Sequence, residues 1–484
     1  MLVHKNRKHL TLISNFIGSW YRNTYKKMCR NENTILCPII LFWDGTSIDS
    51  KSRKNLYPLN FSLGIFNTAT RRLKEAWKVL ALFPSFTETM KETKDSSTTP
   101  QNFHTILQAA TRSLKYLQQG PGLRWKFLHG GIEVEVNMKF PVAFINGDTE
   151  GHNRLAAKKG QSTHVCRICN VETKHCSDEN RIFELTKQTE MEEWKKKGDH
   201  EKIEGLAYHA INNGLYGLDF GMSEQGLHSA LAGEILHMVL YGLHPYAIQG
   251  LLVFVRTNTD STKNMIVGKV LENLHQNLSR ITRKLKHQSE RSLPKYDINL
   301  KFLEQPTLNA FEFPAAILAM LIMLVSDAGR EQLLIRRKLS IVRYCRFIHI
   351  FEMLLSVSEF FQKDEIKLGQ LNRFEWQAKA LMRFYKDAIQ RQEGNGHNII
   401  KFHLMLHVHM FMDMFGTMAH FDSGPGESYH KTVIKTAARR TKRQKGTLNR
   451  ETGARIVHQQ VIERACRAYG LQNIEEYQKF ATEH

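Results

Sequence analysis

The chain has 484 residues, of which 42% are hydrophobic, and its 68 Lys and Arg exceed its 47 Asp and Glu to give a formal net charge of +21. This length is too great for one ordinary core and predicts about two or three packed units. The charge favours a polyanionic partner, because a basic surface gains affinity by releasing counterions from phosphates. The alternative is that excess Lys only keeps the protein dispersed.

Three simple features argue against a secreted or membrane protein. The seven cysteines are an odd and sparse set, unlike a disulfide framework. No signal peptide opens the chain, and the longest apolar stretch, residues 314–325, is too short to span a bilayer. We therefore expect an intracellular protein in a reducing compartment. The basic patch at 435–445 is compatible with nuclear import.

The first 150 residues have mostly strand-like patterns. Apolar runs at 35–43, 56–66 and 76–83 predict three successive strands in a meander. A polar loop is expected at 86–101. It is followed by an amphipathic helix over 102–118, where apolar residues recur every three or four positions.

Strand character then returns at 123–146, first as a hairpin through 129–131 and then as a run that ends just before Asp148. From 206 to 385 helical spacing dominates, which predicts a large, mostly helical insertion. An exposed basic connector is expected at 283–296 and a turn back toward the core at 393–398.

Three acidic residues lie in separate contexts that suit a metal site. Asp44 and Asp148 each close an apolar strand-like run, and Glu427 opens a basic helix. Carboxylates are the ligands that hard divalent cations prefer in phosphoryl transfer. The alternative for both aspartates is an ordinary turn, and Asp49 is a local competitor of Asp44.

Cations follow Glu427 at helical spacing. Glu427 is followed by a cation every four residues, at Lys431, Lys435, Arg439 and Arg443. Arg440 lies beside Arg439. One helical face would then carry an acid and a row of cations, which suits contacts with a DNA backbone. A merely solvated face, with Glu427 favouring the helix dipole and pairing with Lys431, is the alternative.

A second constellation has the composition of a zinc site. Cys166 and Cys169 form a CxxC pair, and His403 and His407 share one helix face at i and i+4. Together they complete a Cys₂His₂ set for structural zinc. His409 is a less suitable second histidine, and ordinary partly buried histidines are the alternative. Large aromatics and nearby polar residues are expected to be structural, namely Trp43, Trp77, Trp125, His175 and Cys176.

Several of these motifs occur in the order of a known family. The stretches WDGTSID, PVAFINGDTEGH, CRIC, EILH and FDSGPGESYHK resemble those of DDE transposases of CACTA-type and Plavaka-type DNA transposons, over about residues 36–465. The resemblance implies an α/β RNase H-like core, a mixed sheet flanked by helices, interrupted by the helical insertion. It divides the chain into a basic segment 1–34, the first part of the core at 35–150, an insertion with the CxxC at 151–400, and C-terminal helices at 401–484.

The same resemblance implies an activity and its cofactors. Asp44, Asp148 and Glu427 would hold two Mg²⁺ or Mn²⁺ ions for DNA cleavage and 3′-hydroxyl strand transfer. One zinc ion would tie the insertion to the core, and Glu234 and His237 resemble an accessory acid-x-x-His signature.

The expected partners are the double-stranded DNA of transposon ends and target, bound by a homo-oligomer in the nucleus. Only about 35 residues precede the first expected strand, which leaves little room for a separate N-terminal DNA-binding domain. A domesticated DNA-binding or assembly protein without catalysis, and a general RNase H-like nuclease, are the alternatives.

Overall fold

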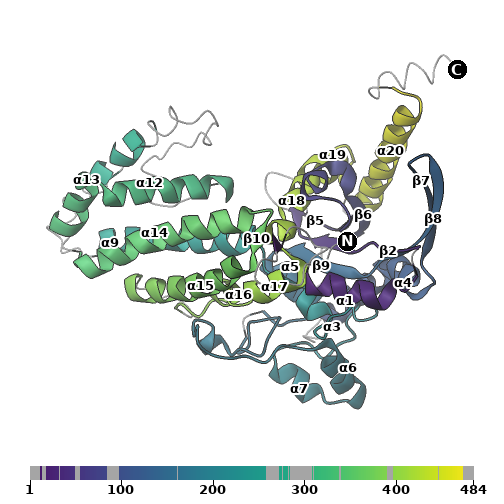
Figure 1. Cartoon of the computed structure of the whole chain (residues 1–484), viewed down its shortest axis with the longest axis horizontal. Helices are drawn as coiled ribbons and strands as arrows, with labels where there is room; N and C mark the ends of the chain where they lie inside the picture. Colours follow the sequence, from purple (N-terminus) through teal and green to yellow (C-terminus); the bar gives the residue numbers. More distant parts are fainter. Residues whose placement is uncertain are drawn as a thin grey trace.

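The structure is a computed structural model that combines a strand-rich body with a lobe of long helices (Figure 1). It describes residues 11–12, 18–31, 33–48, 55–83, 98–160, 162–257, 272–274, 276–281, 283, 308, 310–336, 339–389, 396–444 and 446–471. All but residue 283 of the predicted connector at 283–296, most of the predicted loop at 86–101, and Asp49 lie outside the described residues.

The strands of the described residues belong to three sheets, and the longest helices come after β9 in the chain. The strands are β1 Thr11–Leu12, β2 Thr34–Leu36, β3 Ile39–Trp43, β4 Thr46–Ser47, β5 Asn55–Leu63, β6 Lys78–Phe83, β7 Leu123–His129, β8 Ile132–Lys139, β9 Val142–Gly147 and β10 Ile366–Lys367. The helices most used below are α1 Ser19–Met28, α3 Thr98–Ala110, α4 Arg112–Gln119, α5 Thr149–Leu155, α9 His244–Thr257, α12 Phe313–Val325, α14 Ile341–Gln362, α15 Leu368–Ala388, α16 Ile400–Met405, α17 Val408–Phe415, α18 Gly424–Tyr429, α19 Lys435–Arg439 and α20 Leu448–Ala468.

The central sheet has the strand order β6-β5-β3-β9, with the short β4 also beside β5. β3 pairs antiparallel with β5, and β5 pairs antiparallel with β6, so the predicted meander is confirmed. β9 adds to the other side of β3 in parallel, with Trp43 opposite Gly147. The residues that follow these two partners, Asp44 and Asp148, therefore stand at neighbouring strand ends.

The predicted strand at 35–43 is in fact two strands. β2 pairs in parallel with β8 of the outer sheet, whereas β3 joins the central sheet. Pro38 stands between them and has no N–H to donate to a ladder. The amide of Cys37 still bonds to Lys139 at the end of β8, whereas the amide of Ile39 bonds to Pro141 in the β8–β9 connection.

The predicted helix at 102–118 starts earlier and is broken once. α3 already begins at Thr98, inside the predicted loop, and ends at Ala110. Thr111 separates it from α4, and its hydroxyl donates a hydrogen bond to the Leu107 carbonyl at 2.9 Å. A threonine that bonds back to the preceding turn in this way often bends a helix.

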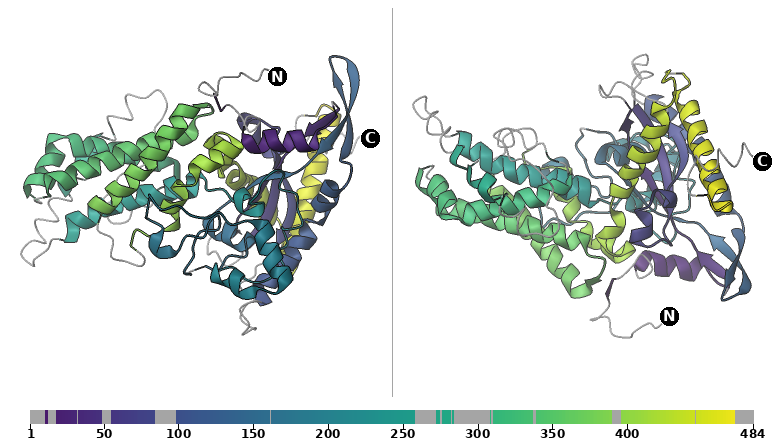
Figure 2. Two further views of the ribbon diagram at one scale, coloured as in Figure 1. Left: turned by 60° about the horizontal axis from the view of Figure 1, so that its bottom comes forward. Right: turned by 90° about the horizontal axis from the view of Figure 1, so that it is seen from above.

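Alternation along β3 divides the interior into two cores. Ile40 and Phe42 face the core that the C-terminal helices share. Ile39, Leu41 and Trp43 face a second core, where Phe103 and Leu107 of α3 also lie. Helices therefore cover both faces of the central sheet, as the views in Figure 2 also show.

The predicted helical insertion is largely observed. Helices α9, α12, α14 and α15 lie side by side in the lobe on the left of Figure 1. No single helix among the described residues is long and apolar enough to span a membrane. The bent pair Phe313–Val325 and Asp327–Arg336 has the required length and apolar composition only when its two helices are taken together. The stretch 156–186, which carries the CxxC, differs from the expectation because its only described helix is a single 3-10 turn, Thr173–His175.

The predicted hairpin through 129–131 is confirmed as β7 and β8, which project from the body at the right of Figure 1. Gly130 and Gly131 form its turn with positive φ values of 58° and 82°. Trp125 on β7 is 56% exposed, so its expected structural role in a core is wrong. Trp43 and Trp77 are buried as expected.

A glycine allows the C-terminal helices to reach the sheet. Gly426 in α18 lies against the ring of Phe42, and a Cβ at this position would stand 2.5 Å from that ring. Phe42 is fully buried and has no space into which to move. The next residue is Glu427, so this contact also sets how near that carboxylate lies to the end of β3.

Replacing Gly426 by Ala is expected to destabilise the protein by about 1–3 kcal/mol, the usual cost of overpacking. Denaturant unfolding of the two proteins measures the difference. Gly369→Ala is the matched control, because Gly369 also lies in a helix but a Cβ there meets nothing within 4 Å. Equal stability of G426A and G369A would contradict the close contact.

Candidate metal centres

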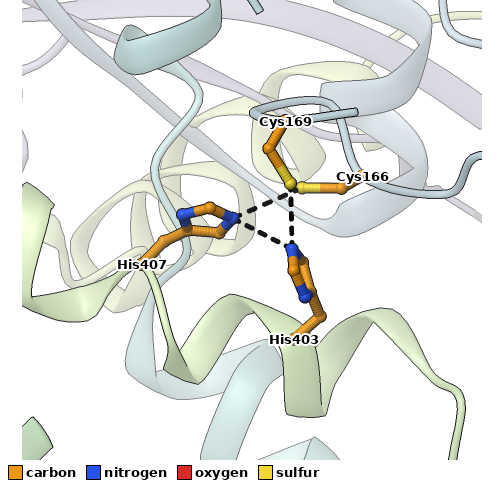
Figure 3. Close-up of side chains that lie close together, drawn as sticks. All are labelled: Cys166, Cys169, His403 and His407. Carbon is orange, nitrogen blue, oxygen red and sulfur yellow. Dashed lines mark hydrogen bonds between the residues drawn. The ribbon is translucent and has the colours of Figure 1, made fainter. Parts of the chain in front are cut away.

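The four residues of the predicted zinc set come together, as Figure 3 shows. Cys169 Sγ lies 3.0 Å from His403 Nε2, and Cys166 Sγ lies 3.7 Å from His407 Nε2. The two histidine Nε2 atoms are 3.0 Å apart. All four ligand atoms lie within 4.8 Å of one another, and all four residues are buried.

Local structure explains the arrangement. The CxxC loop folds back on itself, so that the amide of Ile168 donates to Cys166 Sγ at 3.3 Å. His403 lies in α16 and His407 caps α17, one turn further along. The alternative ligand His409 turns elsewhere, with its Nε2 3.3 Å from Asn372 Oδ1.

The donor set suits zinc better than any other common ion. Two thiols and two imidazoles in a closed, buried group form a Cys₂His₂ site that can bind zinc. Burial opposes a charge on Cys166, but its hydrogen bond with Cys169 and the neighbouring histidines lower its pKa well below the ordinary value. The two imidazole Nε2 atoms, 3.0 Å apart, both face the thiols, so a single cation could be bound by all four side chains.

The second group lies at the end of β3. Oxygens of Asp44 and Glu427 and a ring nitrogen of His430 lie within 4.8 Å of one another. Asp44 comes from the strand, whereas Glu427 lies in α18 and His430 begins the following π-helical turn, His430–Ile434. The sequence interpretation missed His430, although its position one turn after Glu427 is a usable signal.

Asp148 lies near this group. Among the described residues, however, its carboxylate does not belong to the set of ligand atoms within 4.8 Å of one another. One of its carboxylate oxygens accepts a hydrogen bond from the Gly151 amide at 2.5 Å, so it caps the N-terminus of α5. Asp148 still acts on Asp44 through its charge. The three predicted acids therefore converge on one region, with Asp148 to one side.

The surroundings of Asp44 favour its protonated form. Burial, the charge and hydrogen bond of Glu427 and then the charge of Asp148 raise the pKa of Asp44 to about 9. In a partly buried site, a neighbouring negative charge disfavours ionisation of a carboxyl group. A bound divalent cation instead favours the ionised form. A cation between Asp44 and Glu427 would thus stabilise both carboxylates.

Glu234 and His237 form a tight pair beside the acids. Glu234 is 2% exposed and accepts hydrogen bonds from the amides of Leu236 and His237 at 2.6 and 2.7 Å. Its Oε1 lies 2.5 Å from His237 Nδ1. Burial opposes a charge on His237, but Glu234, and then Asp148 and Asp44, raise its pKa to about 9.

Arg167, one of the two residues between the cysteines, interacts electrostatically with both the Cys₂His₂ group and the acids. It is 1% exposed, and its Nε donates to the Leu231 carbonyl at 3.0 Å. Burial lowers its pKa to about 10, but Cys166, Tyr208, Asp148 and Glu234 favour its charged form. The sequence analysis did not single it out, because nothing in the CxxC pattern reports where the middle residues point.

The predicted basic face is shorter than expected. α19 ends at Arg439, and Arg443 lies beyond it with a positive φ of 54°, so the expected face through Arg443 is wrong. The π-helical turn before α19 also changes the spacing of side chains. Lys431, Arg439 and Arg440 are exposed, and Lys435 is half-buried.

Zinc removal should unfold the contact between the CxxC segment and α16–α17. We expect Cys166→Ser to lower zinc affinity at least about tenfold and to lower the melting temperature as well, because structural zinc contributes folding energy. Metal analysis and thermal unfolding measure the two effects. Cys176→Ser is the control, since Cys176 is a buried free thiol outside the group of four. Unchanged zinc content in the Cys166 variant would contradict the site.

A family model described as Plavaka transposase matches residues 4–245, half of the chain. The match includes Asp44, Asp148, the CxxC and the Glu234–His237 pair, and it ends before the histidines of the zinc group and Glu427. No curated protein matches the chain. The chain belongs to the Plavaka transposase family.

Proposed function

We propose that this protein is a DDE-type transposase that cuts DNA strands and joins the freed 3′-hydroxyl to target DNA with Mg²⁺ or Mn²⁺. The observation that carries the proposal is the convergence of Asp44 and Glu427 at the end of β3, with Asp148 at the end of the neighbouring strand. The meander followed by a parallel strand also supports an RNase H-like core for residues 35–150 and 401–484.

Asp44 and Glu427 would hold a divalent cation, and Asp148 would join them in a two-metal site. The bound ions would activate the nucleophile and neutralise charge on the phosphate. In the first reaction, water attacks the phosphorus and the P–O3′ bond breaks, which releases a 3′-hydroxyl. In the second, that hydroxyl attacks a target phosphodiester, and the target's own 3′-oxygen leaves with a proton.

The protein's own groups would prepare this site in two ways. The strand ends of β3 and β9 hold two carboxylates on a rigid edge, which fixes their separation. His237 is held by Glu234 and carries a proton near Asp148, so it supplies a positive charge beside the acids. We propose an accessory role for this pair in orienting the acids or the DNA phosphate.

Exposed cations after Glu427 would bind the DNA backbone. Lys431 lies on the outside of the π-helical turn His430–Ile434, and Arg439 and Arg440 lie on the outside of the end of α19. Lys435 and Arg443 are partly exposed nearby. Such contacts position DNA without reading its sequence. Action on two transposon ends and a target implies a homo-oligomer on DNA and a nuclear site of action.

The direct test is cleavage of transposon-end DNA by purified protein with Mg²⁺ or Mn²⁺. Asp44→Asn and Glu427→Gln are each expected to lower the cleavage rate on the order of 10³-fold, because a metal-centred site supplies several kcal/mol. DNA affinity should change little in either variant. A wild-type protein that binds DNA and never cuts it would select the domesticated DNA-binding alternative, and cutting without joining would select a nuclease.

The basic residues should affect binding and its dependence on salt. Replacing Lys431, Arg439 and Arg440 by Ala together should lower the slope of log affinity against log salt by about 2.7, which is 0.9 for each lost phosphate contact. Fluorescence anisotropy over a salt series measures that slope. As a control, the same number of exposed cations on the helical lobe, Arg330, Arg336 and Arg373, should be replaced. Equal slopes for both triple variants would contradict the proposed DNA face.

A further inference from the structure

His430 lies beside the proposed catalytic acids in an unusual setting. The side chain is 1% exposed, and one ring nitrogen lies within 4.8 Å of the ligand oxygens of Asp44 and Glu427. Its place in a π-helical turn matters, because such turns often re-aim a side chain at a functional site. The turn follows Glu427 directly, so the same segment supplies both side chains.

The central sheet fixes the orientation of the His430 ring. Phe42 of β3 contacts the ring edge-on, with centroids 4.9 Å apart. Asn60, which lies opposite Phe42 on β5 and is fully buried, places its side-chain nitrogen 2.8 Å from His430 Nε2. His430 Nδ1 has no hydrogen-bond partner among the described residues, and neither has Asn60 Oδ1.

The Asn60 contact can select one tautomer of the ring. The two ends of an amide have the same shape, so a half-turn of the Asn60 amide brings its oxygen to Nε2. Nε2 then carries the proton and donates it, and Nδ1 presents a lone pair. A ligating histidine commonly donates its other N–H to an oxygen in this way, which fixes the ring for metal binding.

We propose that His430 is the third protein ligand of the cation held by Asp44 and Glu427, and that this site therefore prefers a transition-metal divalent cation such as Mn²⁺ over Mg²⁺. Imidazole nitrogen suits first-row transition metals, whereas Mg²⁺ favours a shell of oxygens. The inference rests on the proposed function for the roles of Asp44 and Glu427. It adds the nitrogen ligand, its supporting residue Asn60 and the resulting metal preference.

The experiment is calorimetric titration of zinc-loaded, DNA-free protein with Mn²⁺ alone and with Mg²⁺ alone. His430→Ala should weaken Mn²⁺ binding by about 100-fold, the upper end of the range for residues that support a metal site, and should change Mg²⁺ binding far less. Asn60→Ala should weaken Mn²⁺ binding by about tenfold, because it removes only the supporting contact. His430→Asn places an amide oxygen where the ring nitrogen was. Because Mg²⁺ favours oxygen ligands, this variant should bind Mg²⁺ at least as well as the wild type.

His244→Ala is the matched control. His244 is another fully buried histidine with one paired nitrogen, 3.0 Å from Ser358 Oγ, and one unpaired nitrogen, and it lies in the helical lobe. Its loss should leave Mn²⁺ binding unchanged. Thermal unfolding of every variant shows whether it is folded, and His430→Asn keeps a polar side chain in case the Ala variant fails to fold.

The possible results separate this inference from the proposed function. Equal Mn²⁺ affinities in the wild type and both His430 variants would overturn the nitrogen ligand, and so would parallel losses for Mn²⁺ and Mg²⁺. If Asp44→Asn and Glu427→Gln weaken Mn²⁺ binding while His430→Ala does not, only this inference fails. If Asp44→Asn and Glu427→Gln also leave Mn²⁺ binding unchanged, the proposed catalytic site itself fails.

Discussion

The parallel pairing of β3 with β9 is the contact on which the candidate site depends. It aligns Trp43 with Gly147, so that Asp44 and Asp148 follow at neighbouring strand ends. The same pairing fixes which face each residue takes, since side chains alternate along a strand. Phe42 then faces the C-terminal helices, where Gly426 allows a backbone to approach its ring. Without that approach, Glu427 would stand further from Asp44.

Local patterns predicted much of this architecture. Apolar runs ended by turn residues located the meander and the hairpin, and residue types at metal-ligand spacing located the Cys₂His₂ group. Features set by distant partners were missed. Trp125 lies on the exposed side of its strand. Pro38 divides one apolar run between two sheets, and the ring of His430 is held by Asn60, which is far away in the sequence. No window of sequence contains both members of such a pair, so periodicity cannot report them.

The Cys₂His₂ group is buried and the acids are partly buried, and charge interactions of Arg167 link the two. Arg167 leaves the CxxC loop as a cation, and Asp148 and Glu234 are among the charges that favour it. Glu234 in turn holds His237, whose charge is supported by Asp148 and Asp44. Buried polar networks are stable when their members compensate one another, and they lose stability sharply when one is removed. The CxxC loop therefore carries a buried cation that Asp148 and Glu234 favour, and the Cys₂His₂ group also joins two chain segments.

The distance along the chain between β3 and its covering helix has a consequence for protein synthesis. Asn60 and His430 are 370 positions apart, so a growing chain displays the Phe42 face of the sheet long before α18 exists. Contacts of such large separation form late, and exposed apolar strands invite association with other chains in the meantime. A ribosome-bound chain also carries Asp44 and Asp148 without Glu427. If these three acids cut DNA, nuclease capacity arises only after Glu427 has been made, which keeps shorter nascent chains harmless to the genome.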